Sequence, residues 1–320
     1  MSAKYSYKFK QFYFLVIKLA IIFGASYFIY QKLVHNEALS WGSFKEFLQK
    51  YKILEFKNLL VLLLFTMLNW FIEIIKWQQL VNTLKPISFK RAMLQSLSSH
   101  TASIITLNKI GEYGAKALYF KKEKRQIMLL TFLGNFLQLG ATLLFGVFGI
   151  IYLLLIFDIS IPYRRIGRIL VYASVFILGL FRVSKHRKAY LFGFSADKFK
   201  QALKQVPKTI IWKTYALAIL KYLVFSFQFY FLIQLFQVDL NLFQSYIMIS
   251  SMYLISAMLP MFSLFDFVIK GAVAVWLFEK AGISPEIILT ITTIMWLFNF
   301  VFPAILGSFG VLNYSKSQQI

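Results

Sequence analysis

Long apolar runs, separated by short polar and basic stretches, recur along the whole chain. A helix needs about 20 mostly apolar residues to cross the hydrocarbon core of a bilayer. Six stretches meet or approach that length: 11–32, 57–81, 126–157, 166–181, 209–236 and 285–313. The pattern predicts an all-α polytopic transmembrane helical bundle that forms a single membrane domain over residues 1–320.

Two further apolar regions, 92–120 and 243–280, are each interrupted. The first breaks at 108–111, and the second breaks between Pro260 and Asp266. Each half is short for a full crossing, and a break at membrane depth is tolerated where protein or a cavity satisfies the freed backbone groups. We therefore predict two broken-helix re-entrant hairpins.

The sequence resembles itself after a shift of about 154 residues. Four pairs of like residues then coincide: Phe89 with Phe243, Ser96 with Ser250, Glu112 with Asp266, and Lys116 with Lys270. Repeat units fall at about 57–157 and 209–313, and the predicted crossing at 166–181 between them would invert the second unit against the first. Inverted repeats with discontinuous helices are typical of secondary transporters.

Composition and charge favour a membrane location. Of the 320 residues 59% are hydrophobic and 15% are charged, whereas soluble domains carry about 25% charged residues. The net charge of +23 would suggest a nucleic-acid partner in a soluble protein, but here the basic residues lie between apolar runs, so we expect contact with the lipid bilayer and no nucleic acid.

The distribution of basic residues predicts the topology. More than half of the 35 lysines and arginines fall in four segments that a cytoplasmic N-terminus would place on the inside: 1–10, 82–125, 182–208 and 314–320. The positive-inside rule then predicts a multi-pass protein with both termini in the cytoplasm. We expect it in the plasma (inner) membrane.

Two loops mix aromatic residues with lysines at helical spacing, namely 41–54 and 185–205. This composition is typical of helices that lie in the headgroup plane of a bilayer. Ordinary solvated loop helices are the alternative interpretation of both loops.

Ionisable residues within apolar segments are costly and usually face protein or water. Here they are Lys18, Glu73, Lys76, Glu112, Lys116, Lys213, Lys221, Asp266 and Lys270. We expect Lys18, Lys213 and Lys221 to extend toward an interface, as long basic side chains do. The i, i+3 spacing of Glu73 and Lys76 predicts a local ion pair, and both residues are also candidates for lining a cavity.

The break at 108–111 is the strongest candidate for a ligand site. Gly111 gives the backbone freedom to turn, and a helix that begins there would direct its N-terminal amides at the break. Lys109 and Lys116 would reinforce this anion site. A packed elbow in which Glu112 pairs with Lys116 is the alternative.

The second break receives the same interpretation. Asp266 and Lys270 follow Pro260 there, as Glu112 and Lys116 follow the first break. We therefore count both residues among the candidates for substrate binding, and Pro260 among those for lining a cavity.

Signals of an enzyme are mostly missing. The chain has no Cys, its three His residues lack metal-ligand spacing, and neither a nucleotide-binding nor a nucleophile motif is present. We expect no cofactor, no metal and no catalytic residue. His100 is interpreted as a hydrogen-bonded helix residue that could line a cavity.

Several short motifs resemble the lysylphosphatidylglycerol synthase transmembrane region, a family also called flippase-like. In the first half they are Asn69-Trp70, Glu73, Lys76-Trp77, the Lys109-Ile110-Gly111-Glu112 turn, Lys116 and Ala117. In the second half they are Pro260, Lys270-Gly271-Ala272, Phe278, Gly282 and Gly307. The chain departs from the family at its first turn, where Lys109 replaces an Arg and the usual Pro is missing.

The resemblance implies a membrane domain that moves lipids between leaflets. Because the chain ends at Ile320 within that domain, the resemblance does not imply aminoacyl transfer. We expect lipid transport, in which Lys109 and Lys116 hold the headgroup of an anionic phospholipid or lipid-linked glycan and Lys270 faces them. Glu112 and Asp266 would orient the lysines or take part in proton coupling.

Two alternatives stay open at this point. One is a non-transporting accessory or scaffold protein of envelope lipid metabolism. The other is an intramembrane lipid-modifying enzyme, for which His100, Glu112 and Asp266 are the candidate reactive groups.

Overall fold

The computed structural model describes residues 41–104, 106, 110–156, 190–191, 194–195, 203–258 and 266–314. The elements up to residue 156 are α2 (Trp41–Lys50), α3 (Phe56–Val81), α4 (Phe89–Ser103), α5 (Ile110–Leu118) and α6 (Lys124–Ile156). Those that follow are β1 (Tyr190–Leu191), β2 (Phe194–Ser195), α9 (Lys208–Leu235), α10 (Leu242–Ala257), α11 (Asp266–Phe278), η1 (Glu279–Ala281), α12 (Pro285–Trp296), η2 (Leu297–Val301) and α13 (Phe302–Asn313). We call α3 to α6 the first half and α9 to α13 the second half.

Four helical stretches within the described ranges are long and apolar enough to cross a membrane. They are Phe56–Val81, Lys124–Leu155, Lys208–Leu235 and Pro285–Asn313. They agree closely with the predicted spans at 57–81, 126–157, 209–236 and 285–313. The predicted spans at 11–32 and 166–181 lie outside the described residues.

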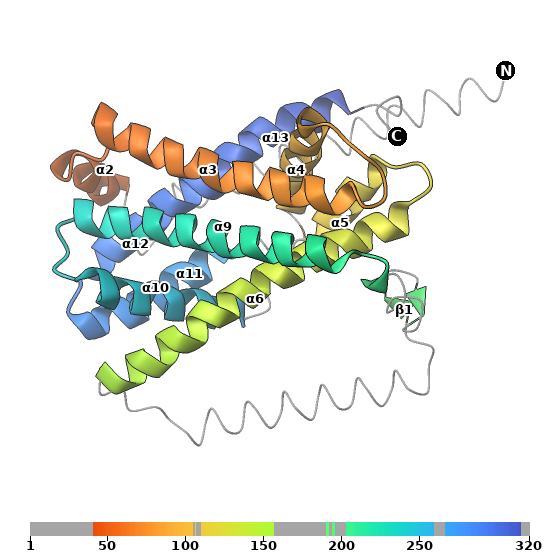
Figure 1. Ribbon diagram of the computed structural model, residues 1–320. Coiled ribbons are helices and arrows are strands. Elements are labelled where there is room, and N and C mark those ends of the chain that lie inside the picture. The colour runs from red at the N-terminus through yellow and green to blue at the C-terminus, as the bar shows by residue number, and fades with distance from the viewer. Residues whose placement is uncertain are drawn as a thin grey trace.

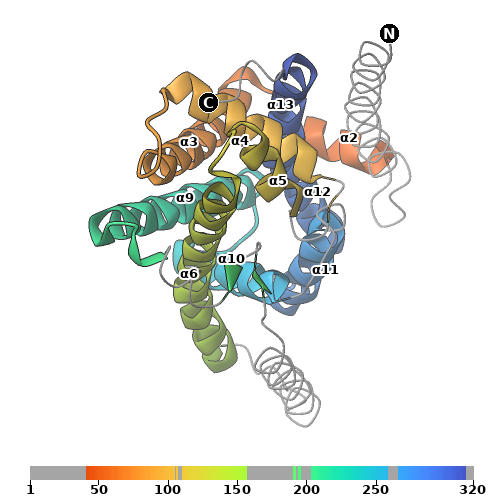
Figure 2. The same cartoon turned by 90° about the vertical axis from the view of Figure 1, so that its right-hand side faces the viewer.

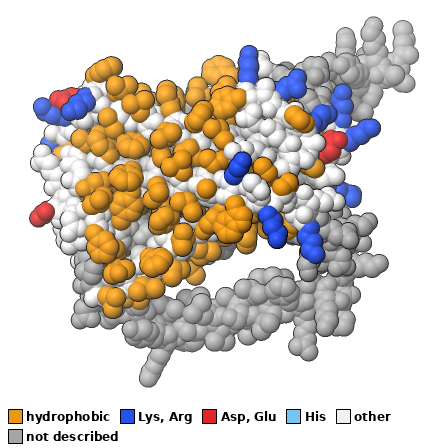
Figure 3. All heavy atoms as spheres, in the orientation of Figure 1, with side chains coloured by type: hydrophobic (Ala, Val, Ile, Leu, Met, Phe, Trp, Pro, Cys, Tyr) orange, Lys and Arg blue, Asp and Glu red, His pale blue; other side chains and the backbone are white. Residues whose placement is uncertain are grey.

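The surface has the apolar middle that a bilayer requires. On the face shown in Figure 3, hydrophobic side chains cover the centre, and most charged side chains lie toward the two ends. Large apolar side chains on different helices are more than half exposed, among them Leu64 on α3, Phe148 on α6 and Phe309 on α13. Lipid would cover such a band in a membrane-embedded helical bundle, so the fold indicates a membrane protein.

The two interrupted regions each contain two short helices. In the first region α4 ends at Ser103 and α5 begins at Ile110, and in the second α10 ends at Ala257 and α11 begins at Asp266. Side-chain caps fix the starts of α4 and α10: Ser88 accepts the amide hydrogen of Arg91, and Asn241 forms a capping box with Gln244.

The two halves are interleaved rather than separate. Helix α3 of the first half packs along α9 of the second half, α4 packs along α13, and α10 packs along α6. Figure 1 shows the long helices from the side, and in the end-on view of Figure 2 the elements of both halves surround a common centre. Gly307 permits the close approach of α13 to α4, because a Cβ there would collide with the Leu97 carbonyl. Gly149 does the same for α6 and α10, where a Cβ would collide with the Ser250 hydroxyl.

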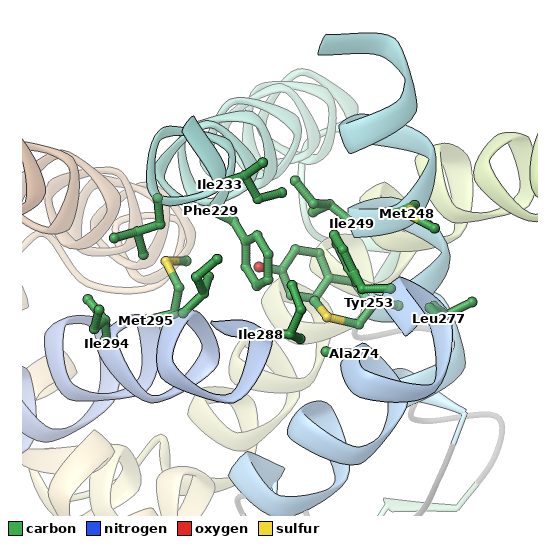
Figure 4. Close-up of a cluster of buried hydrophobic side chains, with 14 of the residues drawn as sticks. Phe229, Ile233, Met248, Ile249, Tyr253, Ala274, Leu277, Ile288, Ile294 and Met295 are labelled. Atoms are coloured by element: carbon green, nitrogen blue, oxygen red, sulfur yellow. The ribbon is translucent and has the colours of Figure 1, made fainter. Parts of the chain in front are cut away.

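The largest hydrophobic cluster lies mostly in the second half. Figure 4 shows Phe229 and Ile233 of α9 beside Tyr253 of α10, with Leu277 of α11 and Ile288 of α12 completing the cluster. These side chains pack α9, α10, α11 and α12 together, and thereby hold the positions from which α9 and α12 present polar residues to the centre.

Two local predictions need correction. Helix α2 is not a solvated loop helix, because its Phe44 is buried in the large cluster and Phe47 and Leu48 pack against the same cluster. The helix predicted across 185–205 is interrupted by the antiparallel pair of β1 and β2, in which Tyr190 is opposite Ser195. Aromatic residues such as Tyr190 and Phe194 favour extended backbone. The remainder of 185–202 lies outside the described residues.

Candidate functional site

A cavity of about 370 Å³ lies between the two halves. Its size falls in the range of ligand sites, which is about 300–1,000 Å³. Helices α3, α4, α5, α6, α9, α10, α11 and α12 and the segment η2 all contribute side chains to the wall. The ionisable residues in this wall are Glu73, Lys76, His100, Glu112, Lys116, Lys221, Tyr222, Tyr253 and Lys270. A bundle whose outer surface is apolar therefore contains a cavity in which charged side chains lie beside apolar and aromatic ones.

Glu73 joins two lysines on one side of this cavity. Its Oε2 atom lies 2.8 Å from Lys76 Nζ and 2.6 Å from Lys221 Nζ. The side chains of Glu73 and Lys76 are 13% and 2% exposed, whereas that of Lys221 is 23% exposed. Lys76 also donates to Gln138 Oε1 at 3.1 Å, and Gln138 Nε2 donates to the Ala218 carbonyl. These bonds connect α3, α6 and α9.

Lys116 forms a second charged group with Glu112. The two side chains pair at 2.7 Å, as their i, i+4 spacing on α5 allows. The Lys116 ammonium lies 4.3 Å from the centre of the Trp77 ring, and the Trp77 indole donates to Gln95 Oε1 at 2.8 Å. A cation–π contact of this kind further stabilises a buried cation. The pairing of Glu112 with Lys116 is thus the packed elbow that we considered as an alternative.

Gly111 supports this elbow in a way that differs from the prediction. It lacks the positive φ that Gly282 has, so it does not provide a left-handed turn. Instead it allows close packing, because a Cβ at Gly111 would lie 2.6 Å from the Ala102 carbonyl of α4. Its amide donates to the Thr106 hydroxyl at 2.9 Å, which anchors the first turn of α5.

The cavity wall contains a defect in a long helix. Pro303 has no amide hydrogen, so the Asn299 carbonyl one turn earlier loses its helical partner, and η2 adopts a π-helical geometry just before Pro303. The Trp70 indole donates to the Asn299 carbonyl at 3.3 Å, and His100 Nε2 lies 3.1 Å from the Phe300 carbonyl. Side chains of α3 and α4 thus satisfy backbone groups of the second half. As predicted, His100 is hydrogen-bonded.

An amide network extends from the same defect. Asn69 Nδ2 donates to Asn299 Oδ1 at 3.0 Å, and Asn299 Nδ2 donates to Gln228 Oε1 at 2.8 Å. Gln228 Nε2 in turn donates to the Thr66 hydroxyl at 3.1 Å. Three helical segments, α3, α9 and η2, meet through these neutral polar groups, and Asn69 and Asn299 also line the cavity.

The structure brings together most of the predicted site residues whose side chains it describes. Glu112, Lys116 and Lys270, together with the candidate lining residues Glu73, Lys76 and His100, all face the one cavity. Gly111 lies beside it at the start of α5. Lys109, Pro260 and the side chain of Asp266 lie outside the described residues.

Lys221 corrects one prediction. It does not extend toward an interface but lines the cavity and pairs with Glu73, whereas Lys213 on the same helix is exposed as expected. The sequence carried only an indirect signal for this role. Lys221 lies about two helical turns beyond Lys213 and therefore deeper in the apolar run, where a lone cation requires a partner.

The chemistry of the cavity suits an anion. Lys76, Lys116, Lys221 and Lys270 line it, against the carboxylates of Glu73 and Glu112 among the described side chains. Trp70, Trp296 and Phe300 give part of the wall an aromatic character. Within the described residues no group of three or more His, Cys, Asp or Glu could hold a metal ion. An amphipathic ligand with a negatively charged group would be complementary to this wall.

Comparisons with known proteins leave the family open. No protein-family model matches the chain, and neither a curated protein nor a solved structure does. The resemblance to the flippase-like family therefore stays a prediction that rests on the short motifs given above.

Proposed function

We propose that the protein is a flippase-like membrane transporter that binds an anionic lipid or lipid-linked glycan and moves it between leaflets. The observation that carries the proposal is the lysine-rich cavity between the two halves. Charged groups at membrane depth are costly, and they usually mark a pathway for an ion or substrate. The lysines of this cavity provide a binding site for a negatively charged headgroup inside an otherwise apolar bundle.

The order of elements supports an internal repeat. A long helix, two short helices and another long stretch occur as α3, α4, α5 and α6, and again as α9, α10, α11 and α12–α13. A shift of 154 residues moves the start of α4 from Phe89 to position 243, one residue after the start of α10, which agrees with the repeat proposed from the sequence.

The packing is reciprocal in the same way. The first short helix of each half packs against the last long stretch of the other half, α4 on α13 and α10 on α6. Inverted-repeat transporters are built from two such units, which pack against each other around a shared binding site and move relative to one another to give alternating access. In this proposal the two interrupted regions are re-entrant hairpins, and their breaks approach the ligand from opposite sides of the membrane.

The same proposal includes the orientation in the membrane. The protein lies in the inner membrane, and the turns at 121–124 and 237–241 lie on opposite sides of it. The basic turn at 121–124 faces the cytoplasm. The chain's ligand would then travel between two aqueous surfaces past the Glu73, Lys76 and Lys221 side chains.

Bound lipid provides the first test of this function. The protein is extracted from membranes together with its surrounding lipid in polymer nanodiscs, and the co-purified lipids are identified by mass spectrometry. Wild type should retain an anionic lipid or lipid-linked glycan above its abundance in the membrane, and the Lys221→Gln variant should lose that enrichment. Equal lipid profiles for both proteins would count against the proposal.

A further inference from the structure

The contact between Glu73 and its two lysines has the geometry of an occupied anion site. A single carboxylate oxygen, Oε2, accepts from Lys76 Nζ at 2.8 Å and from Lys221 Nζ at 2.6 Å. These are the distances of charge-assisted hydrogen bonds, and a phosphate oxygen would make the same contacts with the same donors. The two ammonium groups are therefore already spaced to hold one anionic oxygen between them.

Charge is unbalanced around this oxygen. One carboxylate serves two lysines, and the nearby Lys116 is engaged separately by Glu112 and by the Trp77 ring. Two cations that share one anion in a poorly solvated site attract a further negative charge. Lys221 has the more exposed of the two ammonium-bearing side chains, and it lines the cavity wall together with Glu73 and Lys76.

Glu73 has little other anchoring among the described contacts. Lys76 keeps a second acceptor in Gln138 Oε1, so it stays hydrogen-bonded when Glu73 moves away. Lys221 belongs to α9 in the second half, whereas Glu73 belongs to α3 in the first half. If a ligand anion replaced the Glu73 carboxylate, Lys221 would lose its bond to the first half and gain a bond to the ligand.

We propose that Glu73 is a built-in substitute for the ligand, whose carboxylate holds the place of a phosphate group between Lys76 and Lys221 until a phosphate-bearing ligand displaces it. This inference rests on the proposed function and names the recognised group as phosphate. In the empty cavity the Glu73 carboxylate offsets part of the charge of the two lysines. Because it competes with the ligand, it also lowers the affinity for the ligand. Both effects suit a transporter, which must bind its cargo and also release it.

The test compares affinities for two phosphate probes. Purified protein in dodecyl maltoside is titrated calorimetrically with dihexanoyl phosphatidylglycerol and, separately, with inorganic phosphate. The variant Glu73→Gln removes the competing charge and keeps a polar side chain of similar shape. Glu286→Gln is the matched control, because it removes one negative charge from a fully exposed carboxylate that bonds Ser284 at the start of α12.

The expected result is that Glu73→Gln binds a phosphate probe at least tenfold more tightly than wild type, while Glu286→Gln matches wild type. Adding Lys221→Gln to Glu73→Gln should abolish the gain. A gain with phosphatidylglycerol alone identifies the source as a lipid headgroup, and a gain with both probes identifies the phosphate group itself. Unchanged or weaker binding of both probes by Glu73→Gln, including no binding at all, would overturn the proposal.

A second variant protects the test against misfolding. Glu73→Asp keeps the charge but shortens the side chain, so its carboxylate cannot bridge both ammonium groups as closely. It should tighten binding severalfold, and an unchanged affinity in a folded Glu73→Asp protein would also overturn the proposal. Lipid movement by wild-type protein is a separate measurement. If wild type moves no lipid but Glu73→Gln binds phosphate more tightly, the transport function is wrong and the anion site is supported. If wild type moves lipid but Glu73→Gln gains no affinity for phosphate, only the proposal that Glu73 takes the place of a phosphate group is wrong.

Discussion

Lys221 Nζ lies 2.6 Å from Glu73 Oε2, although 148 residues separate the two in the sequence. The contact joins α9 to α3 and therefore joins the two halves at the wall of the cavity. An ion pair at this depth is costly to form and is weak evidence for stability. Its position at the cavity wall instead fits the proposed role in binding and releasing an anion.

The first prediction concerns Lys221. Replacing it with Gln should slow the transbilayer movement of anionic lipid about tenfold or more, equivalent to about 1.4 kcal/mol of lost interaction per tenfold change. The fold should survive, because Glu73 keeps its bond to Lys76. Lys213→Gln, on the exposed part of the same helix, is the control and should retain the wild-type rate in a fluorescence assay of lipid exchange. An equal loss in both variants would point to a surface-charge effect instead.

The second prediction concerns the packing of α4 on α13. Gly307→Ala should destabilise the protein by about 1–3 kcal/mol, because the added methyl group meets the Leu97 backbone, which cannot move aside as a side chain could. Gly114→Ala is the matched control, since nothing lies within 4 Å of the added atom. That change should be neutral or stabilising by about 0.4–1 kcal/mol. Thermal unfolding in detergent, followed by circular dichroism, measures both, and equal melting temperatures for the two variants would show that the helices do not pack this closely.

The third prediction separates a structural His100 from a catalytic one. His100→Phe removes the hydrogen bond to the Phe300 carbonyl and should cost about 1 kcal/mol of stability while leaving lipid exchange measurable. Thr101→Val, which removes the neighbouring bond to the Ala304 carbonyl, should have a similar cost. If His100→Phe is as stable as wild type but inactive, the interpretation as an intramembrane lipid-modifying enzyme gains support.

The fourth prediction concerns topology, which the absence of native cysteine makes simple to measure. A cysteine placed at Lys122, in the turn between α5 and α6, should react with a membrane-impermeant maleimide only after the cells are opened. A cysteine at Asp239, in the turn between α9 and α10, should react in intact cells. Both positions are exposed, so access across the membrane is the variable that differs. The same labelling pattern at both sites would rule out the proposed inverted arrangement.

The sequence was sufficient to predict the four described spans because their signal is local. About 20 apolar residues in a row are visible without any knowledge of neighbours. The polar break predicted at 108–111 also indicated the division into two helices, although α4 ends earlier, at Ser103, and α5 already begins at Ile110. The Glu112–Lys116 pair followed from helical spacing alone. These features depend on residues within one or two turns of each other.

The cavity depended on tertiary contacts that no local pattern contains. Lys221 was assigned to an interface because its partner Glu73 belongs to another helix in the other half of the chain. The pairing of Trp70 with the Asn299 carbonyl required two facts from different places, namely a helix defect near Pro303 and the packing of α3 against η2. Buried Phe44 in α2 was missed for the same reason, since only the packed cluster shows which of its faces is covered.

An assay of lipid movement between leaflets tests the proposed transport most directly. Purified protein is reconstituted into liposomes that contain a trace of phosphatidylglycerol with a fluorescent acyl chain, and dithionite added outside quenches the label as it reaches the outer leaflet. Wild-type protein and Lys213→Gln should accelerate quenching of the inner-leaflet label equally, and Lys221→Gln should do so about tenfold more slowly or not at all. Wild-type protein that matches empty liposomes for phosphatidylglycerol and for other labelled anionic lipids would contradict the proposed transport.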